Sequence, residues 1–430
     1  MPTVTVQGAN NQPVTLNYTS AEAASAAQAL VGTIASDLRS GTLTAVSYMG
    51  GTMPAETNAA LFVSSSGSTI TQQAGYNTVL LNGNGPNTIL GSSGAQVRVI
   101  GDDGNLTYVF GAGTPGTVVA GDGNNYITVP TTGGSLFNVV VGSGSNTIAL
   151  ESGRGTIAAG MGNNTIALGT SNAKIYAAGN AVIAGDQSGA APGSSGSDTI
   201  AAGGGATAVY AGASNVTFIG GTGTATVQGG TGSDTIFARG ATGLFVAGST
   251  GNSFLSGGAT SAAQVSVSGG AVVSGQILSG TADGDSVFAG VRGAEYLTAG
   301  SGNETLDGSF SSGNNAYYAS ATASAATQIL TGSGNSTIVG GMGASTVSAG
   351  TGSNAFAFVN GQGGSMTIVN FNPTIDNVVL YGYAAGAAQA AIAGAQVNTG
   401  TTPGTTVTLS DNTKIVFQGY TGGFNSTNFA

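Results

Sequence analysis

One short phrase recurs along this chain and restricts its fold more than any other feature. It reads Gly-x-Gly-x-Asn-Thr-Ile, with Asp, Glu or Ser in some copies at the fifth position and Leu or Val at the seventh. The clearest copies are GNGPNTI (83–89), GDGNNYI (121–127), GSGSNTI (142–148), GMGNNTI (160–166), GTGSDTI (230–236), GSGNETL (300–306), GSGNSTI (332–338), GMGASTV (341–347) and GTGSNAF (350–356). Their spacings cluster near nine, eighteen and twenty-one positions, which is typical of a repeat architecture.

Each copy predicts a glycine turn followed by a short strand. Glycine permits the positive φ of a tight turn, Asn or Asp bonds its own backbone there, and the alternating β-branched residues after the turn predict a strand with one buried face. A single coil cannot bury that face, whereas stacked coils can. We therefore predict an all-β fold, a parallel β-solenoid of the β-roll or β-helix kind, with a short N-terminal helical cap region and a C-terminal β-hairpin region.

The pattern divides the chain into residues 1–75, the repeats of 76–370, and a tail of 371–430. In the first region Thr19-Ser20-Ala21-Glu22 matches a capping box with Thr19 as the N-cap, and Gly41 stands where a C-cap glycine is expected. Apolar residues at helical spacing lie between them (Ala23, Ala27, Leu30, Val31, Ile34 and Leu38), so we predict a helix over about residues 20–39. We expect its apolar stripe to pack either as a cap on the end of the repeat region, the favoured interpretation, or as a self-association surface.

The tail of residues 371–430, like the first 75 residues, departs from the repeat. Alternating residues over 405–409 and 414–417, joined by Ser-Asp-Asn-Thr at 410–413, predict a β-hairpin.

Composition narrows the functional classes. The 430 residues include 77 Gly but no Cys, His or Trp, and 40% are hydrophobic while 6% are charged, a balance that argues against disorder. Seven scattered basic residues against 17 acidic ones, for a net charge of −10, do not form a nucleic-acid-binding patch. The N-terminus lacks the pattern of a secretory signal peptide, and no apolar stretch is long enough for a membrane span.

The repeated phrase resembles the nonapeptide of RTX proteins, the hemolysin-type calcium-binding repeat family, whose coils bind Ca²⁺ in a parallel β-roll. The segment MTIVNFNPTIDNVVL (366–380) and the hairpin TLSDNTKIVFQGY (408–420) are similar to the segments after such repeats in proteins exported by type I secretion. The resemblance covers about residues 76–430. It implies secretion by an uncleaved C-terminal signal, without an N-terminal signal peptide, to the cell surface or beyond.

The chain departs from that family at the charged Ca²⁺ ligand. Most copies hold Asn or Ser where the RTX phrase has Asp, and Asn is neutral. Since Ca²⁺ affinity falls with the number of charged ligands, we expect ladders of stacked Asn to replace metal in most turns. Ca²⁺ is then expected at few sites, for which the candidate ligands are Asp102, Asp122, Asp198, Asp234, Asp283 and Asp285; each is equally well interpreted as a turn former.

No catalytic constellation is evident. Nucleophilic triads and zinc hydrolysis usually need His or Cys. The neighbouring carboxylates Asp102/Asp103, Asp283/Asp285 and Glu304/Asp307 are better explained as turn residues than as a glycosidase pair. Arg154, Lys174, Arg239 and Arg292 are too isolated in sequence to indicate a polysaccharide lyase.

The sequence thus favours a non-enzymatic, secreted structural protein that self-assembles into a surface layer, filament or biofilm-matrix fibre. Its partners are expected to be copies of itself and a cell-surface or matrix polysaccharide. The alternatives are a monomeric adhesin or carbohydrate-binding protein and, less favoured, a polysaccharide-acting enzyme that uses carboxylates alone. Thr222, Thr224 and Thr226 are too irregularly repeated to favour an ice-binding face.

Overall fold

The structure is a computed structural model of the whole chain, and its residues cluster into two compact units. Unit 1 comprises Met1–Thr217 and Gly221–Thr224, and unit 2 comprises Phe218–Gly220 and Ala225–Ala430. The structure describes residues 2–83, 85–93, 96–130, 135–187, 196–239, 241–246, 254–258, 265–268, 277–279, 286–290, 292 and 294–429.

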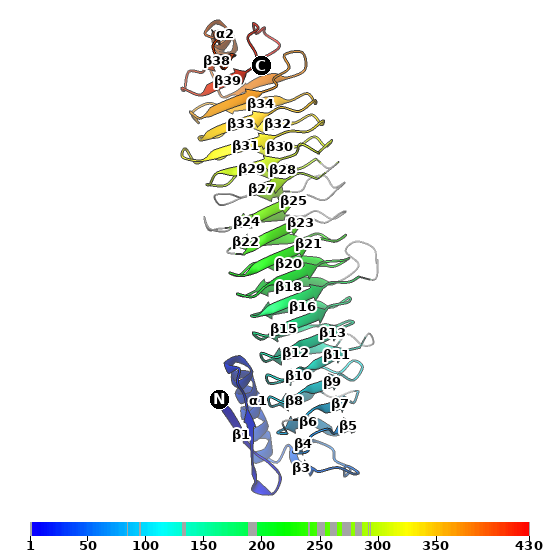
Figure 1. Cartoon of the computed structure of the whole chain (residues 1–430). Helices are drawn as coiled ribbons and strands as arrows, with labels where there is room; N and C mark the ends of the chain where they lie inside the picture. Colours follow the sequence, from blue (N-terminus) through cyan, green and yellow to red (C-terminus); the bar gives the residue numbers. More distant parts are fainter. Residues whose placement is uncertain are drawn as a thin grey trace. The chain divides into compact units, whose positions relative to one another are not determined.

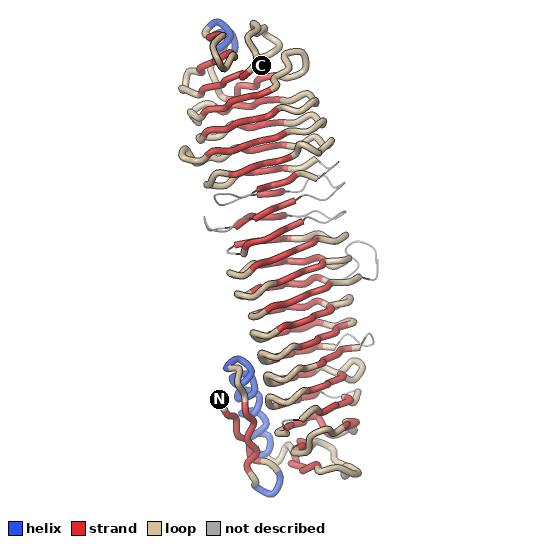
Figure 2. The backbone as a smooth tube through the Cα atoms, in the orientation of Figure 1, coloured by secondary structure: helices blue, strands red, loops and turns tan. Residues whose placement is uncertain are grey.

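Each unit is a β-solenoid in which the chain alternates between two parallel sheets (Figures 1 and 2). The first sheet of unit 1 consists of β3 (Thr44–Tyr48), β4 (Ala59–Val63), β6 (Tyr76–Leu81), β8 (Val97–Gly101), β10 (Gly116–Val119), β12 (Leu136–Val141), β14 (Arg154–Ala159), β16 (Asn172–Ala177) and β18 (Ser197–Ala202). Its second sheet consists of β5 (Thr69–Thr71), β7 (Asn87–Leu90), β9 (Leu106–Val109), β11 (Tyr126–Val129), β13 (Asn146–Leu150), β15 (Asn163–Ala167), β17 (Asn180–Ala184) and β19 (Thr207–Tyr210). The strands β20 (Asn215–Ile219) and β21 (Thr224–Gln228) include the division between the units.

Unit 2 repeats this plan. Its first sheet consists of β22 (Thr235–Arg239), β24 (Phe254–Gly258), β26 (Ile277–Ser279), β28 (Tyr296–Thr298), β30 (Ala316–Tyr318), β32 (Thr337–Val339), β34 (Ala355–Val359) and β36 (Asn377–Tyr381). Its second sheet consists of β23 (Thr242–Val246), β25 (Val265–Ser268), β27 (Ser286–Phe288), β29 (Glu304–Asp307), β31 (Ala326–Leu330), β33 (Ala344–Ser348), β35 (Ser365–Val369), β37 (Gln396–Asn398), β38 (Gly404–Thr408) and β39 (Lys414–Gln418). The predicted parallel β-solenoid is confirmed.

The core of each unit forms because equivalent residues of successive coils lie in register. In unit 1, Val139, Ile157 and Ile175 are consecutive partners in the first sheet, and all are buried. The residues between them face outward, since side chains alternate across a strand. In the copies of the phrase at 142–148 and 160–166, Ile148 and Ile166 are likewise buried and Thr147 and Thr165 are exposed.

The repeated glycines have a different role from the one predicted. We expected them to supply positive φ, but Gly142, Gly144, Gly160 and Gly162 are not among the residues with positive φ. An added Cβ at Gly160 would instead lie 2.3 Å from the carbonyl oxygen of Gly142, and one at Gly162 would lie 2.0 Å from that of Ser143. Glycine is required because stacked turns approach each other closely.

The N-terminal region covers the side of unit 1. A hairpin of β1 (Thr3–Gln7) and β2 (Pro13–Asn17), joined by the 3₁₀ turn η1 (Ala9–Asn11), precedes α1 (Ala21–Arg39). The apolar face of α1 packs on outward-facing residues of the first sheet, including Leu80, Ile100 and Val119, so the helix lies beside the coils (Figure 1). The helix is confirmed, and the parallel strands begin at Thr44, inside the 1–75 stretch.

The ends of α1 agree with the sequence in one detail and differ in another. Gly41 has a φ of 72°, as expected of a C-cap glycine. The N-cap is Ser20, whose hydroxyl oxygen accepts from the Ala23 N–H at 3.2 Å, so the assignment to Thr19 was wrong. Thr19 instead donates its hydroxyl to Asp103, 2.9 Å away, and thereby ties the start of the helix to a turn of the solenoid.

The C-terminal region closes unit 2. The predicted hairpin is confirmed as antiparallel β38 and β39, and β39 also pairs in parallel with β35. The short helix α2 (Ala387–Ala393) precedes this hairpin. Neither helix in the described part of the chain has the length and hydrophobicity of a membrane span.

Candidate functional site

The described carboxylates among the predicted Ca²⁺ ligands, Asp102, Asp122, Asp198 and Asp234, lie in turns or at the starts of strands. Asp102 follows β8 and is 2% exposed; one of its oxygens accepts from the Gly104 N–H, and the other has no hydrogen-bond partner. Burial raises the pKa of Asp102 above its usual range, with a smaller contribution from the neighbouring Asp103. Because an unpaired buried carboxylate is costly, this position either holds a proton or needs a cation.

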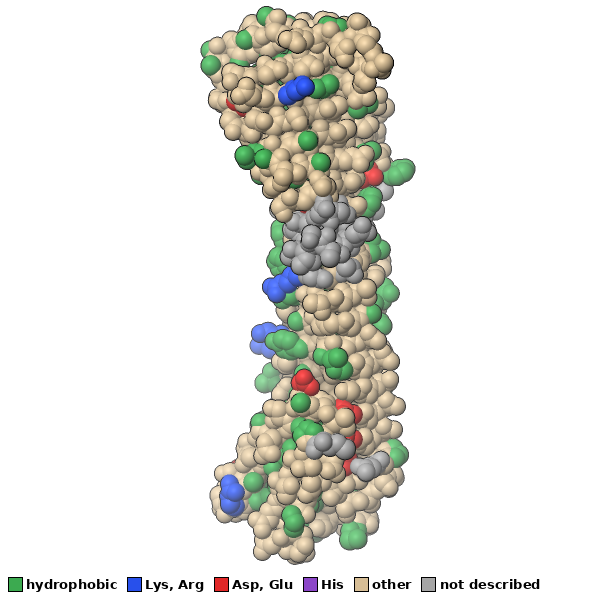
Figure 3. Space-filling model, turned by 60° about the vertical axis from the view of Figure 1, so that its left-hand side comes forward, with side chains coloured by type: hydrophobic (Ala, Val, Ile, Leu, Met, Phe, Trp, Pro, Cys, Tyr) green, Lys and Arg blue, Asp and Glu red, His purple; other side chains and the backbone are tan. Residues whose placement is uncertain are grey.

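Asp122, another predicted ligand, is bonded to Asp103, the residue that follows Asp102 in the previous coil. The Asp122 N–H donates to the Asp103 carboxylate at 2.9 Å, and Asp122 in turn accepts from the Ser143 N–H. The carboxylates of Asp103 and Asp122 thus follow one another on adjacent turns and bind the backbone of the next coil. In the view of Figure 3 charged side chains are few, and several acidic ones lie one above another over part of the solenoid.

The other predicted ligands are separate from this pair. Asp198 lies in β18 and Asp234 directly before β22, both buried. Asp198 accepts from the Ala173 N–H at 2.9 Å, and burial raises its pKa to about 7. Asp283 and Asp285 lie outside the described residues.

Within the described ranges, no group of three or more Asp, Glu, His or Cys side chains is placed to hold a metal ion. Calcium therefore stays a prediction, for which backbone carbonyls would have to provide most of the six to eight oxygen ligands.

The expected amide ladder is present in unit 1. Asn125 donates its side-chain N–H to the Asn146 oxygen at 2.9 Å, and Asn146 donates to the Asn164 oxygen at 3.0 Å. Each of the three also donates to glycine carbonyls of its own turn, as Asn146 does to Gly144 at 2.9 Å. These three residues, the amide column, answer why the chain has Asn where the RTX phrase has Asp: the amide binds both its own turn and the next coil without a metal ion.

Unit 2 contains a mixed column at the strand starts of its first sheet, whereas the amide column of unit 1 lies at strand starts of the second sheet. Glu295, Asn315, Ser336, Asn354 and Asp376 precede β28, β30, β32, β34 and β36, and all are buried. The Glu295 N–H donates to Asn315, and the Asn354 side chain donates to Asp376 at 3.1 Å. Burial raises the pKa of Glu295 to about 7 and also raises that of Asp376.

Two of the carboxylate pairs considered for catalysis are not arranged as pairs, and the third, Asp283/Asp285, lies outside the described residues. Glu304 is buried with Leu306 on the inner face of β29, whereas Asp307 lies at a position of opposite parity. Because alternate residues of a strand face opposite sides, these two carboxyl groups do not flank a common space. Asp102 and Asp103 differ in the same way, one buried and the other bound to Thr19 and the Asp122 backbone.

The sequence analysis did not predict β3, the first strand of the first parallel sheet in unit 1. β3 pairs in parallel with β4, and among the described residues no strand pairs with its other edge. None of its five residues is buried, whereas all five residues of β4 are. Met49, directly after β3, is 85% exposed.

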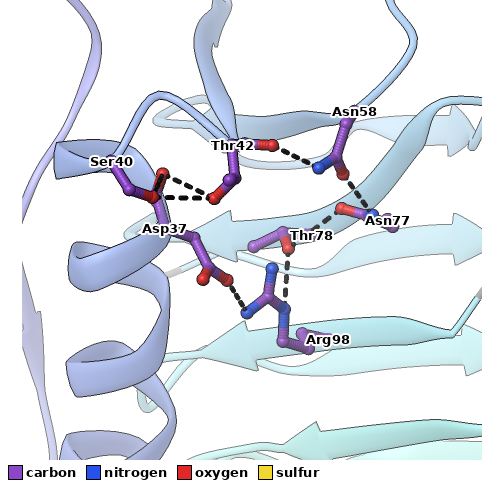
Figure 4. A network of polar contacts seen from close by, with 7 residues as sticks. All are labelled: Asp37, Ser40, Thr42, Asn58, Asn77, Thr78 and Arg98. Carbon is purple, nitrogen blue, oxygen red and sulfur yellow. Dashed lines mark hydrogen bonds and ion pairs between the residues drawn. The ribbon is translucent and has the colours of Figure 1, made fainter.

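The surroundings of this edge are fixed by polar contacts (Figure 4). Arg98 on β8 forms an ion pair with Asp37 of α1 at 2.6 Å and donates to Thr78 at 3.0 Å. From Thr78 the contacts continue through Asn77 and Asn58 to the Thr42 carbonyl, shortly before β3. The edge strand is therefore held in place between the helix end and the first coils.

Sequence reasoning also missed that Arg154 and Lys174 are close. They lie on the adjacent strands β14 and β16 and line one groove on the outer face of unit 1. Their separation along the chain is close to the length of one coil, and this was the available signal.

A scan against models of protein families finds no family that matches this chain, and a search of curated proteins finds no significant match.

Proposed function

We propose that this chain is a secreted structural protein that joins copies of itself into a surface layer, filament or biofilm-matrix fibre. The observation that carries the proposal is the open edge of β3 in unit 1. A β-strand at a sheet edge presents unpaired N–H and C=O groups, which are a template for another strand.

The sequence of this edge strand lacks two devices that usually prevent such pairing, which are charge and proline. β3 reads TAVSY and contains no Lys, no Pro and no other charged residue. Natural edge strands are often blunted by charge, proline or a covering element. In unit 2 the corresponding edge is occupied, because Val378 of β36 pairs with Phe429 and its N–H donates to the Asn428 carbonyl at 2.7 Å. We therefore assign the contact between copies to the N-terminal end of unit 1.

A contact between two β3 edges is two-fold and joins molecules in pairs. A layer or fibre then needs a second contact, which the size distribution of the assemblies would reveal.

Secretion rests on the resemblance of the repeats and tail to RTX proteins. The tail segment contributes Phe371 and Asp376 to the folded end of unit 2. Fusion of residues 371–430 to a reporter in a host with a type I secretion system tests this part: export supports it, and retention in the cell counts against it. We propose Ca²⁺, if bound, at the turns of Asp102 and Asp122.

The assembly is tested on the purified full chain by light scattering and electron microscopy over a range of concentrations. We expect species heavier than the 41.1 kDa chain. Ser47→Lys places a charge on the exposed edge strand and should reduce assembly strongly. Thr165→Lys places the same charge at an exposed position of the internal strand β15 and should not. A wild-type chain that stays monomeric at all concentrations, with and without Ca²⁺, would refute the proposal.

A second candidate, a carbohydrate-binding protein, is favoured by the groove that contains Arg154 and Lys174.

A further inference from the structure

The outer face of the first sheet in unit 1 contains a groove of about 680 Å³. One row of its lining residues crosses successive strands in register: Thr117, Asn138, Thr156, Lys174 and Thr199. At a spacing of about 4.8 Å between strands, this row extends for roughly 19 Å. The groove thus offers hydroxyl, amide and ammonium groups at a regular spacing.

The groove concentrates positive charge on an acidic chain. Two of the seven basic residues, Arg154 and Lys174, line it, and no Asp or Glu is among its described lining residues. Both are exposed, and the ion pair found in the described ranges joins Arg98 to Asp37 instead. An anionic ligand would therefore find two cations that no described carboxylate neutralises, on a chain whose net charge of −10 otherwise repels it.

The register sets the distance between these cations. Arg154 is opposite Asn172, and Lys174 is opposite Thr156, so the two are one strand apart and two residues apart along the strand. Their Cα atoms are then separated by roughly 8 Å. Arg can bind a carboxylate through two parallel N–H groups, and Lys acts as a point charge. The pair suits an extended polymer with repeated acidic groups better than a single small anion.

Tyr176 adds an apolar platform beside the cations. It is two residues after Lys174 on β16, hence on the same face, and is 55% exposed. Its neighbours across the sheet are Ala158 and Ala201, whose small side chains leave the ring accessible. Glu22, whose carboxylate accepts the Ser20 hydroxyl, lines the neighbouring depression next to Tyr176, so the anionic groups of a ligand are favoured at Arg154 and Lys174 and not at this border. An aromatic ring with a polar tip suits a ligand that is apolar on one face and hydroxylated at its edges.

Other acidic polymers fit less well. The strands β12, β14 and β16 are paired on both sides, so a peptide cannot add to them as a further strand. Single-stranded nucleic acid needs several stacking aromatics along its path, and the described lining of the groove includes one aromatic residue, Phe137, which is buried.

We propose that this groove, with Tyr176 at its border, binds an acidic polysaccharide whose anionic groups are carboxylates. Arg154 and Lys174 bind the carboxylates, the row of Thr and Asn side chains binds hydroxyl groups, and Tyr176 contacts a sugar ring. The inference goes beyond the proposed function and does not depend on assembly.

The test measures binding of the folded full chain to three soluble polymers by affinity electrophoresis and calorimetry: a polyuronate, a neutral glucan and a sulfated glucan. Chelator is present throughout, because Ca²⁺ could bridge two acidic polymers. We expect the polyuronate to bind best and to bind more weakly as salt is raised to roughly 0.5 M. The Arg154→Gln/Lys174→Gln variant should lose at least about tenfold in affinity.

Matched variants separate the site from general effects. Arg39→Gln removes one positive charge at an exposed position at the end of α1 and should not change binding. Tyr176→Ala should weaken binding by about threefold to tenfold, whereas Tyr126→Ala, which removes a 46% exposed ring from the second sheet, should not. Circular dichroism checks that each variant is folded.

Three results would overturn the inference: a double variant that binds the polyuronate like the wild type, a neutral glucan that binds equally well, or a preference for the sulfated polymer. Ser47→Lys separates this inference from assembly. A chain with that substitution should bind the polyuronate unchanged even where assembly is lost, and loss of binding in that variant alone would place the ligand at the β3 edge instead.

Discussion

The N-terminal end of unit 1 and the C-terminal end of unit 2 differ, although the same kind of coil builds both units. In unit 1 the first strand, β3, has no buried residue and no partner on its free edge among the described residues, while α1 covers the side of the coils. In unit 2 the last coil is closed by the residues after β39, where Phe417 packs against Phe371 and Phe424 at ring distances of 4.7 Å. The repeat therefore specifies stacking, and the non-repeating sequence decides whether a stack can be extended.

The buried columns of polar side chains also differ between the two units. The amide column of unit 1 is neutral and bonds each coil to the next. The mixed column of unit 2 includes Glu295 and Asp376, whose pKa values are raised by burial. Both kinds of column are compatible with the fold, but the mixed column makes the free energy of unfolding depend on pH.

The largest expected effect is at the closed end. Phe417→Ala should lower the free energy of unfolding of unit 2 by about 3–5 kcal/mol, because it removes a fully buried ring from the aromatic cluster. Met49→Ala, at the open end of unit 1, should change stability by less than about 0.5 kcal/mol since Met49 is exposed. Urea unfolding followed by circular dichroism measures both.

Equal effects of these two variants would contradict the contrast between the ends. The Phe417→Ala chain should also show faster hydrogen exchange in peptides from β36, because its covering segment loses support.

Much of this architecture could be predicted because it depends on local pattern. The Thr-Ile alternation predicted the strands, and the apolar spacing from Ala23 to Leu38 predicted α1. The N-cap was misassigned because Thr19 and Ser20 are both good caps, and the choice depends on Asp103, far away along the chain, which binds Thr19. The role of Gly160 was missed for a similar reason: the carbonyl that excludes a side chain there belongs to the previous coil.

The site residues were harder to predict from the sequence because the coils vary in length. Strand register places Lys174 beside Thr156 of the previous coil and beside Thr199 of the next coil, and the second of these steps along the chain is the longer one. A fixed period therefore does not align distant side chains. Arg154 and Lys174 are about one coil apart along the chain, but only the strand register shows that they lie on adjacent strands. The open edge of β3 could not be predicted for another reason. A free edge is the absence of a neighbouring strand, and the sequence of the strand itself does not indicate that absence.

The next largest effect tests the mixed column through pH. Burial raises the pKa of Glu295 from 4.5 to about 7 in the folded chain, so the folded state holds this proton more tightly than the unfolded state. Stability from this group is thus complete below about pH 4.5 and is lost as pH rises to about 7, for a total of up to about 3 kcal/mol. Glu295→Gln should remove that decline, measured as the difference in unfolding free energy between wild type and variant at pH 5 and pH 8.

The same experiment bears on calcium. If a cation bound Glu295, the carboxylate would be favoured and stability would rise with pH in the presence of the ion. A wild-type chain that is more stable relative to Glu295→Gln at pH 8 than at pH 5 would therefore replace the buried-proton explanation with a metal site.

The smallest of the three effects concerns the amide column. Asn146→Ala removes the donor to Asn164 and the acceptor used by Asn125, at a position that is 1% exposed. It should cost about 1–3 kcal/mol, because buried polar groups of two neighbouring coils lose a partner. Asn124→Ala, in the adjacent turn, removes an exposed side chain that accepts from the Ser145 N–H, and it should cost less than half as much. Since no carboxylate titrates in this column, the effect of Asn146→Ala should be the same at pH 5 and pH 8. A cost that changes with pH would mean that the neutral and mixed columns do not differ in the way the two units imply.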